Sequence, residues 1–267
     1  MKLSLSTYII EKYSLLSNLS KIADLPIKNL EIWGNFEDHF NFLSKRETNK
    51  LLKDLNKYDL KVVSLHAPYG LDIAAFDEKE RKKNVSMIKK SIDCLSNLNG
   101  EFLVLHGSKK AEYIPSFQEK KEKSIISLKE ILEYAISKNK KIALENLFNV
   151  FFYTTSEKLL DVINKFKSPF LGVCVDVGHI NLISNINVIK EISEYQGKIF
   201  NIHLSDNDGI LDKHLHLNKG NIDWKNIFKK LKKINYQGYY TLEIKHCSNW
   251  FEEIKKSIEF AKKEIEE

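Results

Sequence analysis

A carboxylate and an imidazole stand three residues apart in the stretch VCVDVGHINL, residues 173–182. The apolar, β-branched run before Asp176 is typical of a buried strand, so Asp176 and His179 mark the point where that strand ends. Carboxylate oxygens and imidazole nitrogens bind divalent cations, and the same groups transfer protons. A single pair of this kind is more often part of a turn, so its meaning depends on what the neighbouring strands carry at their ends.

Short apolar runs recur along the chain, each followed by a polar loop and a longer segment with helical periodicity. The runs that predict strands are KLSLS, NLEIW, KVVSLH, EFLVLH, KIALEN, FLGVCVD, KIFNIHLSD and YYTLEI. The amphipathic segments are clearest at residues 79–98, 118–139, 156–166, 224–234 and 249–267. Alternating strands and helices predict parallel pairing, and eight such units in about 250 residues are typical of a single (β/α)₈ TIM barrel. A doubly wound α/β sheet is the second choice, because no glycine-rich phosphate loop follows residues 2–6.

In such a barrel the functional side chains lie at the carboxyl ends of the strands. The predicted strands end, in chain order, at Glu31, His66, His106, Glu145, Asp176, His203 and Glu243. Six of the eight histidines lie at or just after an end, which scattered surface histidines would not produce; they are His66, His106, His179, His203, His214 and His216. Carboxylates mixed with imidazoles, without thiolates, indicate a divalent cation that accepts oxygen and nitrogen ligands, with Mn²⁺, Mg²⁺, Co²⁺ and Zn²⁺ all open.

The composition and charge of the chain indicate what kind of protein carries this site. The 267 residues are 43% hydrophobic, and four prolines and ten glycines are scattered rather than pooled in a linker, which predicts one domain over residues 1–267. Glu11 and Lys12 interrupt the apolar start of the chain, and no run is long enough to cross a membrane. Cys94, Cys174 and Cys247 form no CxxC pattern and suggest buried thiols in a reducing cytoplasm. The net charge of +6 comes from lysines interspersed with acids, which favours solvated helix faces over a polyanion surface. The oligomeric state stays open, a homo-oligomer included.

Several motifs follow one another in an order that resembles the xylose isomerase-like barrel superfamily. They are LHAPYGLDIA, LVLHGS, IALEN, CVDVGH, NIHLSDNDG, DKHLHLNKGNIDW and YTLEI, and they run from about the third strand to the C-terminus. That superfamily contains sugar-phosphate isomerases and epimerases and also the endonuclease IV-type apurinic endonucleases. The resemblance implies a common metal site made of Glu145, Asp176, His203 and Glu243.

The resemblance to the sugar enzymes implies a divalent-metal-dependent isomerase or epimerase of a sugar, sugar phosphate or polyol. Glu145 and Glu243 would then face each other across the substrate, so that one takes a proton from the carbon next to the carbonyl and the other returns it. The metal would polarise the substrate oxygens and stabilise the enediolate that develops.

The endonuclease branch provides the alternative function, zinc-dependent hydrolysis of phosphodiesters at abasic sites. Resemblance to it implies ligands for two further metals, with His66 and His106 joining Glu145, and His179 joining Asp212 and His214. Two observations oppose it. The first strand lacks the Gly-Ala-His opening of that branch, and the cations near strand ends include no arginine for a phosphate clamp; they are Lys109, Lys110, Lys213, Lys219 and Lys245. A neutral carbohydrate or polyol is therefore the preferred partner, and nucleic acid is the second choice. A metal-binding barrel without catalysis is the third functional alternative.

Other positions keep more than one role at this point. His66 and His106 either bind a metal or substrate, or they hydrogen-bond to Glu145. His179 either binds a metal or substrate, or it caps the helix that follows. Glu31, Trp33 and Tyr69 are expected to line the substrate pocket, where aromatic rings stack on sugar faces. Asn218 stands where both branches tend to have glycine, which leaves the local turn open.

Overall fold

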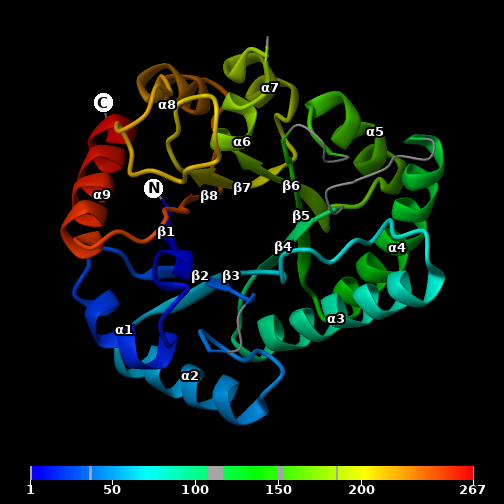
Figure 1. The fold of residues 1–267 in the computed structure, drawn as a ribbon, viewed down its shortest axis with the longest axis horizontal. Coiled ribbons are helices and arrows are strands. Elements are labelled where there is room, and N and C mark those ends of the chain that lie inside the picture. The colour runs from blue at the N-terminus through cyan, green and yellow to red at the C-terminus, as the bar shows by residue number, and fades with distance from the viewer. Residues whose placement is uncertain (1, 36–37, 108–116, 149–152, 185, 267) are drawn as a thin grey trace.

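The computed structural model describes residues 2–35, 38–107, 117–148, 153–184 and 186–266. Within these residues, parallel strands close into one barrel in the order of the chain, and Figure 1 looks down its axis. The expectation of a TIM barrel is therefore confirmed. The strands are β1 (Lys2–Ser6), β2 (Asn29–Trp33), β3 (Lys61–His66), β4 (Phe102–His106), β5 (Lys141–Glu145), β6 (Leu171–Asp176), β7 (Ile199–Leu204) and β8 (Tyr239–Leu242).

Helices surround the barrel in an outer ring (Figure 1). They are the 3₁₀ helix η1 (Thr7–Ile10), α1 (Leu15–Ala23), α2 (Lys45–Lys57), α3 (Glu78–Asn97), α4 (Phe117–Ser137), α5 (Ser156–Phe166), α6 (Val177–Asn181), α7 (Val188–Glu194), α8 (Trp224–Lys233) and α9 (Trp250–Glu266). The five helices predicted from periodicity lie within two residues of these bounds, because apolar spacing marks the buried face and capping residues such as Asp77 and Thr155 mark the start. None of the helices in the described residues combines the length and apolar character that a membrane crossing needs.

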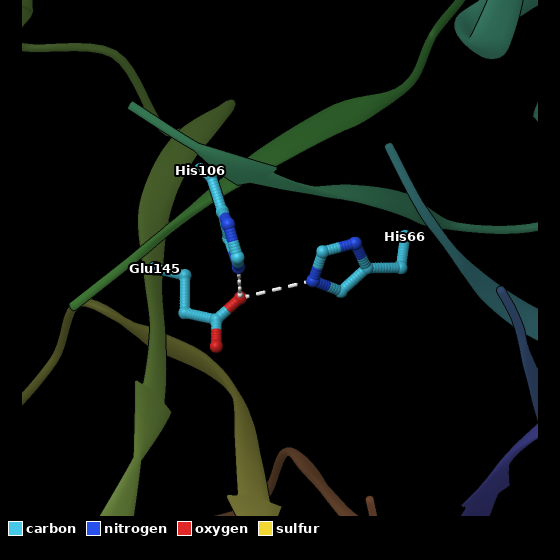
Figure 2. Close-up of side chains that lie close together, drawn as sticks. All are labelled: His66, His106 and Glu145. Carbon is cyan, nitrogen blue, oxygen red and sulfur yellow. Dashed lines mark hydrogen bonds and ion pairs between the residues drawn. The ribbon is translucent and has the colours of Figure 1, made fainter. Parts of the chain in front are cut away.

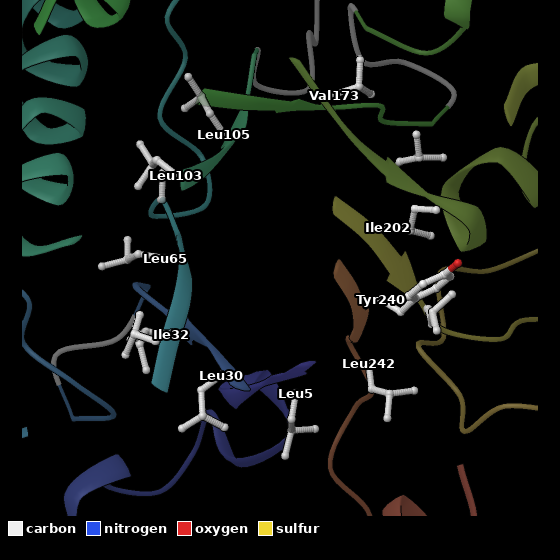
Figure 3. Close-up of a cluster of buried hydrophobic side chains, with 14 of the residues drawn as sticks. Leu5, Leu30, Ile32, Leu65, Leu103, Leu105, Val173, Ile202, Tyr240 and Leu242 are labelled. Carbon is white, nitrogen blue, oxygen red and sulfur yellow. The ribbon is translucent and has the colours of Figure 1, made fainter. Parts of the chain in front are cut away.

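Alternate side chains of each strand point in opposite directions, and this alternation separates the core from the site. One set packs outside the strands against the helices, as Figure 3 shows for Leu5, Leu30, Leu65, Leu103 and Ile202. The other set points into the barrel. Its lower part is an apolar plug, and its upper part is polar and carries the candidate site. The plug consists of Val63, Phe102, Val104, Ala143, Cys174 and Tyr239.

The strand ends agree with expectation at four of the seven positions. Strands β3 to β6 end at His66, His106, Glu145 and Asp176, as predicted, whereas His203 is the next-to-last residue of β7 and Glu243 follows β8 directly. The expected ending at Glu31 is wrong, because β2 continues to Trp33. A strand of five residues spans only about 17 Å, so this difference of two residues moves a side chain by one full layer of the barrel.

Candidate metal centre

Four side chains from consecutive strands converge at the upper end of the barrel. Glu145, Asp176, His203 and Glu243 each place one ligand atom within 4.8 Å of the other three, and all four are buried. The Nδ1 atom of His203 lies 3.1 Å from Oε2 of Glu243 and 3.4 Å from Oε1 of Glu145. It lies 3.8 Å from Oδ2 of Asp176. Two ligands bound about 2.1 Å from one cation are separated by about 3.0–3.5 Å, so these distances suit a shared divalent ion.

Unsatisfied polar atoms support the same fit. Glu145 Oε1, Asp176 Oδ2 and His203 Nδ1 are buried without a hydrogen-bond partner in the described part of the chain. Leaving such atoms unpaired in a barrel interior costs free energy, and a charged oxygen costs more than a neutral one. A divalent cation at their centre would satisfy all three, and their mixture of oxygen and nitrogen suits Mn²⁺, Mg²⁺, Co²⁺ or Zn²⁺.

The second cluster joins Glu145 to two histidines from β3 and β4, and Figure 2 shows both imidazoles directed at one carboxylate oxygen. The Nε2 atoms of His66 and His106 each lie 3.1 Å from Oε2 of Glu145. Nδ1 of His66 is 2.8 Å from the carbonyl oxygen of Ala67, to which it donates. In neutral His66 the lone pair on Nε2 would then face a carboxylate, so either a proton or a cation must lie between them.

The third cluster consists of His179, Asp212 and His214. Oδ2 of Asp212 lies 3.2 Å from Nε2 of His214 and 3.5 Å from Nε2 of His179. Burial, the largest influence, would by itself lower the pKa of His214, but the hydrogen bond and charge of Asp212 together with the charges of Glu243 and Asp176 outweigh it and raise the pKa to about 9. The same two histidines hold the pKa of Asp212 well below its usual value against the effect of burial. This set has the ligand types and spacing of a further cation site.

A structured loop between β7 and α8 carries Asp212 and His214. Asp206 and Leu215 form a two-way backbone bridge across it, and the Asp206 carboxylate accepts a hydrogen bond of 3.0 Å from the Trp224 indole. Asn218 adopts a positive φ of 63°, a conformation that glycine and asparagine tolerate best. Asparagine is therefore compatible with the backbone of this turn.

The opening motif folds so that Asp176 divides its two oxygens between two tasks. Oδ1 accepts a hydrogen bond of 2.7 Å from the His179 backbone and caps α6, while Oδ2 stays free for the cluster. The capping residue is Asp176 and not His179. Asn146 holds the same backbone: its Oδ1 accepts from Asp176 N at 2.8 Å, and its carbonyl oxygen accepts from His179 Nδ1 at 2.9 Å. The spacing of three residues is thus a helix cap that also orients a carboxylate.

The electrostatics differ among the three buried acids. Burial would raise the pKa of Glu145, but His106 and His203 outweigh burial and hold it well below the usual value. Burial would also raise the pKa of Glu243, whereas His203 lowers it, and the net result is a pKa of about 2. At Asp176 burial dominates, and with the nearby Glu145 it raises the pKa to about 6. Glu145 and Glu243, the two proposed catalytic acids, are therefore ionised at neutral pH. Among the three acids, Asp176 is the one whose ionised form its surroundings disfavour.

A pocket of about 280 Å³ opens above these clusters, near the lower end of the roughly 300–1,000 Å³ common for small-molecule sites. Nine of the residues singled out in the sequence line it, namely Trp33, His66, Tyr69, His106, Glu145, His179, Asp212, His214 and Glu243. Asp176 and His203 lie beneath them and are fully buried. Glu31 does not line the pocket, which corrects the expectation for that residue. It lies one layer lower, under His203.

Sequence reasoning did not identify five further lining residues: Tyr8, Glu11, Asn35, Leu147 and Phe148. Tyr8 belongs to η1, which follows β1 at once because the Ser6 side chain accepts from the Tyr8 backbone. Position directly after a barrel strand was the available signal for Tyr8, Asn35 and Leu147. Of the lysines considered near strand ends, Lys213 pairs with Asp208, and Lys109 and Lys110 lie outside the described residues.

Comparison with known proteins places this geometry in a family. Residues 19–264 match the family model described as "Xylose isomerase-like TIM barrel". A Methanocaldococcus jannaschii protein named "Uncharacterized protein MJ1311" is 30% identical over 255 residues, which cover 92% of this chain and 84% of the relative. A crystal structure described as that of a D-tagatose 3-epimerase-like protein is 30% identical, with a TM-score of 0.87, and the match covers 100% of this chain and 97% of the other.

Relatives with both kinds of name are found at lower identity. The "L-ribulose 3-epimerase" of a Methylomonas species is 25% identical over 202 residues, or 72% of this chain and 68% of the relative. The "Probable endonuclease 4" of Mycoplasmopsis pulmonis is 28% identical over 203 residues, or 68% of this chain and 70% of the relative. The match to the family model extends over nearly the whole barrel, from α1 to the last turns of α9. The chain therefore belongs to the xylose isomerase-like TIM barrel family.

Proposed function

We propose that this protein is a divalent-metal-dependent epimerase or isomerase of a small carbohydrate or polyol. The observation that carries the proposal is that Glu145 and Glu243 line the pocket and also belong to the four-residue cluster beneath it. Two acids beside one cation can carry out reversible proton transfer next to a carbonyl, with one acid on each side of the reacting carbon. The similarity to the D-tagatose 3-epimerase-like protein and to the L-ribulose 3-epimerase supports the same class.

Glu145, Asp176, His203 and Glu243 would hold the cation, which when bound supplies Lewis acidity at the substrate carbonyl and hydroxyl oxygens. Glu145 and Glu243 present buried carboxylates with low pKa values, so either can act as the unprotonated base at neutral pH. One carboxylate takes the proton from the carbon next to the carbonyl. The other, which takes up a proton from solvent when substrate binds, delivers it to the opposite face and inverts the configuration, and the first carboxylate then returns its proton to solvent.

The upper pocket provides surfaces for an uncharged, hydroxylated substrate. The Tyr8 and Trp33 rings lie 4.9 Å apart and offer apolar faces for sugar C–H groups. The indole Nε1 of Trp33 is buried without a partner in the described residues and is free to donate to a substrate oxygen. No lysine or arginine is among the described lining residues, whereas Glu11 and Asp212 add two further carboxylates. This charge balance favours a neutral carbohydrate over a phosphorylated one.

The second candidate is abasic-site endonuclease activity, and one observation favours it. All three clusters contain ligand types for a cation, and Glu145 belongs to two of them, which is the arrangement that a three-metal phosphodiesterase needs. The relative named for endonuclease 4 points the same way. Against it, the described lining of the pocket contains no lysine or arginine, and DNA binding requires such cations along the phosphate backbone.

The deciding experiment offers the metal-loaded protein ketoses, aldoses and inositols in deuterated water and, in parallel, an abasic duplex at low and physiological salt. We expect metal-dependent deuterium incorporation next to the carbonyl that falls at least a hundredfold in Glu145→Gln and Glu243→Gln. Asp223→Asn, an exposed helix cap far along the loop, serves as the matched control. Duplex incision at physiological salt without exchange on any sugar would establish the second candidate instead.

A further inference from the structure

We propose that Glu31 is a positioning residue for His203, holding a proton on Nε2 so that Nδ1 is free to bind the cation. The inference rests on the metal site of the proposed function. Nδ1 of His203 faces Glu145, Asp176 and Glu243, while Nε2 points the other way, towards Glu31. An imidazole can bind a metal through either nitrogen, so the group that takes the remaining proton decides which one is available.

The contact between Glu31 and His203 is close and buried. Nε2 of His203 lies 3.1 Å from Oε1 of Glu31 and 3.3 Å from Oε2, and both side chains are fully buried. His203 is the only basic side chain within ion-pair distance of Glu31 in the described part of the protein. A buried carboxylate with a single basic neighbour orients that neighbour strongly, because the alternative is an unpaired buried charge.

Other hydrogen bonds prevent Glu31 from turning away. Its Oε2 accepts from Ser64 Oγ at 2.8 Å and from Asn201 Nδ2 at 3.2 Å. The Asn201 amide is itself oriented, since its Oδ1 accepts from Thr241 Oγ1 at 2.8 Å. Side chains from β2, β3, β7 and β8 thus form one polar layer directly below the cluster. The same Oε2 accepts the hydrogen bond from His203 Nε2 at 3.3 Å, while Oε1 lies 3.1 Å from Nε2 in ion-pair contact without a hydrogen-bond partner among the described residues.

His203 is distinguished from the other histidines of the site by this partner. The far nitrogens of His66, His179 and His214 contact backbone carbonyl oxygens, at 2.8–2.9 Å. For His106 no partner of Nδ1 is found within the described residues. Nδ1 of His179 and of His214 also lies 3.5 Å and 3.7 Å from a carboxylate oxygen, of Glu145 and Glu243, but its nearer partner is the carbonyl oxygen. Among the described residues, the far nitrogen of His203 has a carboxylate as its nearest partner, at 3.1 Å. An anionic acceptor makes the imidazole more basic at the nitrogen that faces the metal, whereas a carbonyl oxygen only fixes the tautomer.

The test measures metal affinity without substrate, using Mn²⁺ and Zn²⁺ in competition with a chelator. Glu31→Gln keeps the shape and an oxygen acceptor but removes the charge, and we expect binding to weaken about 10- to 100-fold. Ser91→Ala is the matched control, since it removes a buried side-chain hydrogen bond within α3, to the carbonyl oxygen of Met87, and we expect it to weaken binding less than about threefold. Unfolding temperatures establish that both variants are folded. Unchanged affinity in Glu31→Gln would overturn the inference.

A second readout uses the unmodified protein and does not depend on whether a variant folds. Nitrogen-15 spectra of the zinc-loaded protein, with the His203 ring assigned through correlations to its own backbone resonances, should show Nε2 protonated and Nδ1 without a proton. A proton on Nδ1 would refute the proposal. Both readouts are independent of catalysis, so a protein that converts no sugar but loses metal affinity in Glu31→Gln would contradict the proposed function and support this inference.

Discussion

Replacing Asp176 with asparagine should stabilise the metal-free protein and weaken its response to metal. Asparagine retains an oxygen at the Oδ1 position, so the cap on the His179 backbone survives. At the Oδ2 position it replaces a buried oxygen that lacks a hydrogen-bond partner. The new amide hydrogens face the carboxylates of Glu145 and Glu243, which are acceptors within the same 4.8 Å cluster. One substitution therefore removes a repulsive charge and adds a donor.

The magnitude follows from the pKa of Asp176, which burial and neighbouring acids raise from 3.8 to about 6. A tenfold change in proton affinity corresponds to about 1.4 kcal/mol, so the ionised side chain costs about 3 kcal/mol of folding free energy. This cost is complete above pH 6 and disappears as the pH falls towards 3.8. For a chain of this size each kcal/mol changes the unfolding temperature by about 2 °C, which predicts an increase of about 6 °C in metal-free Asp176→Asn at pH 7.

Thermal unfolding in the presence of a chelator measures this difference at pH 7 and at pH 4.5, where we expect it to shrink. Unmodified protein at a metal concentration of a hundred times Kd should gain about 2.7 kcal/mol, whereas Asp176→Asn should gain little at the same concentration. Asp77→Asn is the matched control, since Asp77 caps α3 in the same way, at 2.7 Å from Glu80 N, outside the clusters. A metal-free Asp176→Asn protein that is less stable than the unmodified protein would refute the reasoning.

Three further predictions concern the pocket, the barrel and the third cluster. Trp33→Phe should raise KM about tenfold and leave metal affinity unchanged, because the indole Nε1 is a buried donor without a partner in the described residues. Steady-state kinetics with the substrate found by isotope exchange tests this prediction, and an unchanged KM would contradict it. Gly107→Ala should lower stability by about 1–3 kcal/mol in denaturant unfolding, since its Cβ would lie 2.0 Å from the Tyr153 ring; equal stability would show that the ring moves freely. Metal binding at the third cluster should weaken about tenfold for each pH unit below 9, because His214 must lose a proton before it can bind the metal. Calorimetry in buffers of different ionisation heat should detect the released proton. If no proton is released, His214 is not a ligand.

Much of the barrel could be predicted from local sequence patterns, because these patterns show which side of each helix or strand is buried. Helix α5 was predicted with the bounds that the structure has, since Thr155 caps its start and apolar spacing continues to Phe166. Strands β3 to β6 end in ligand-type residues, which made the cluster visible before any coordinates. Tyr8 and Phe148 were missed because aromatic residues beside a strand are common in cores, and only their position in space distinguishes a pocket wall.

The residue types at the strand ends, the alternation of strands and helices and the motif order were enough to determine the barrel and to single out Glu145, Asp176, His203 and Glu243. Depth within the barrel was decided only by tertiary structure. The pairing of β2 with β3 shifts between Leu30 and Glu31, which sets Glu31 beside Ser64 and Trp33 beside His66. Strand register depends on contacts between residues far apart in sequence, so local periodicity shows that Glu31 points inward but not at which level. For that reason the sequence suggested a pocket residue, and the closed barrel placed Glu31 beneath the metal cluster, behind His203.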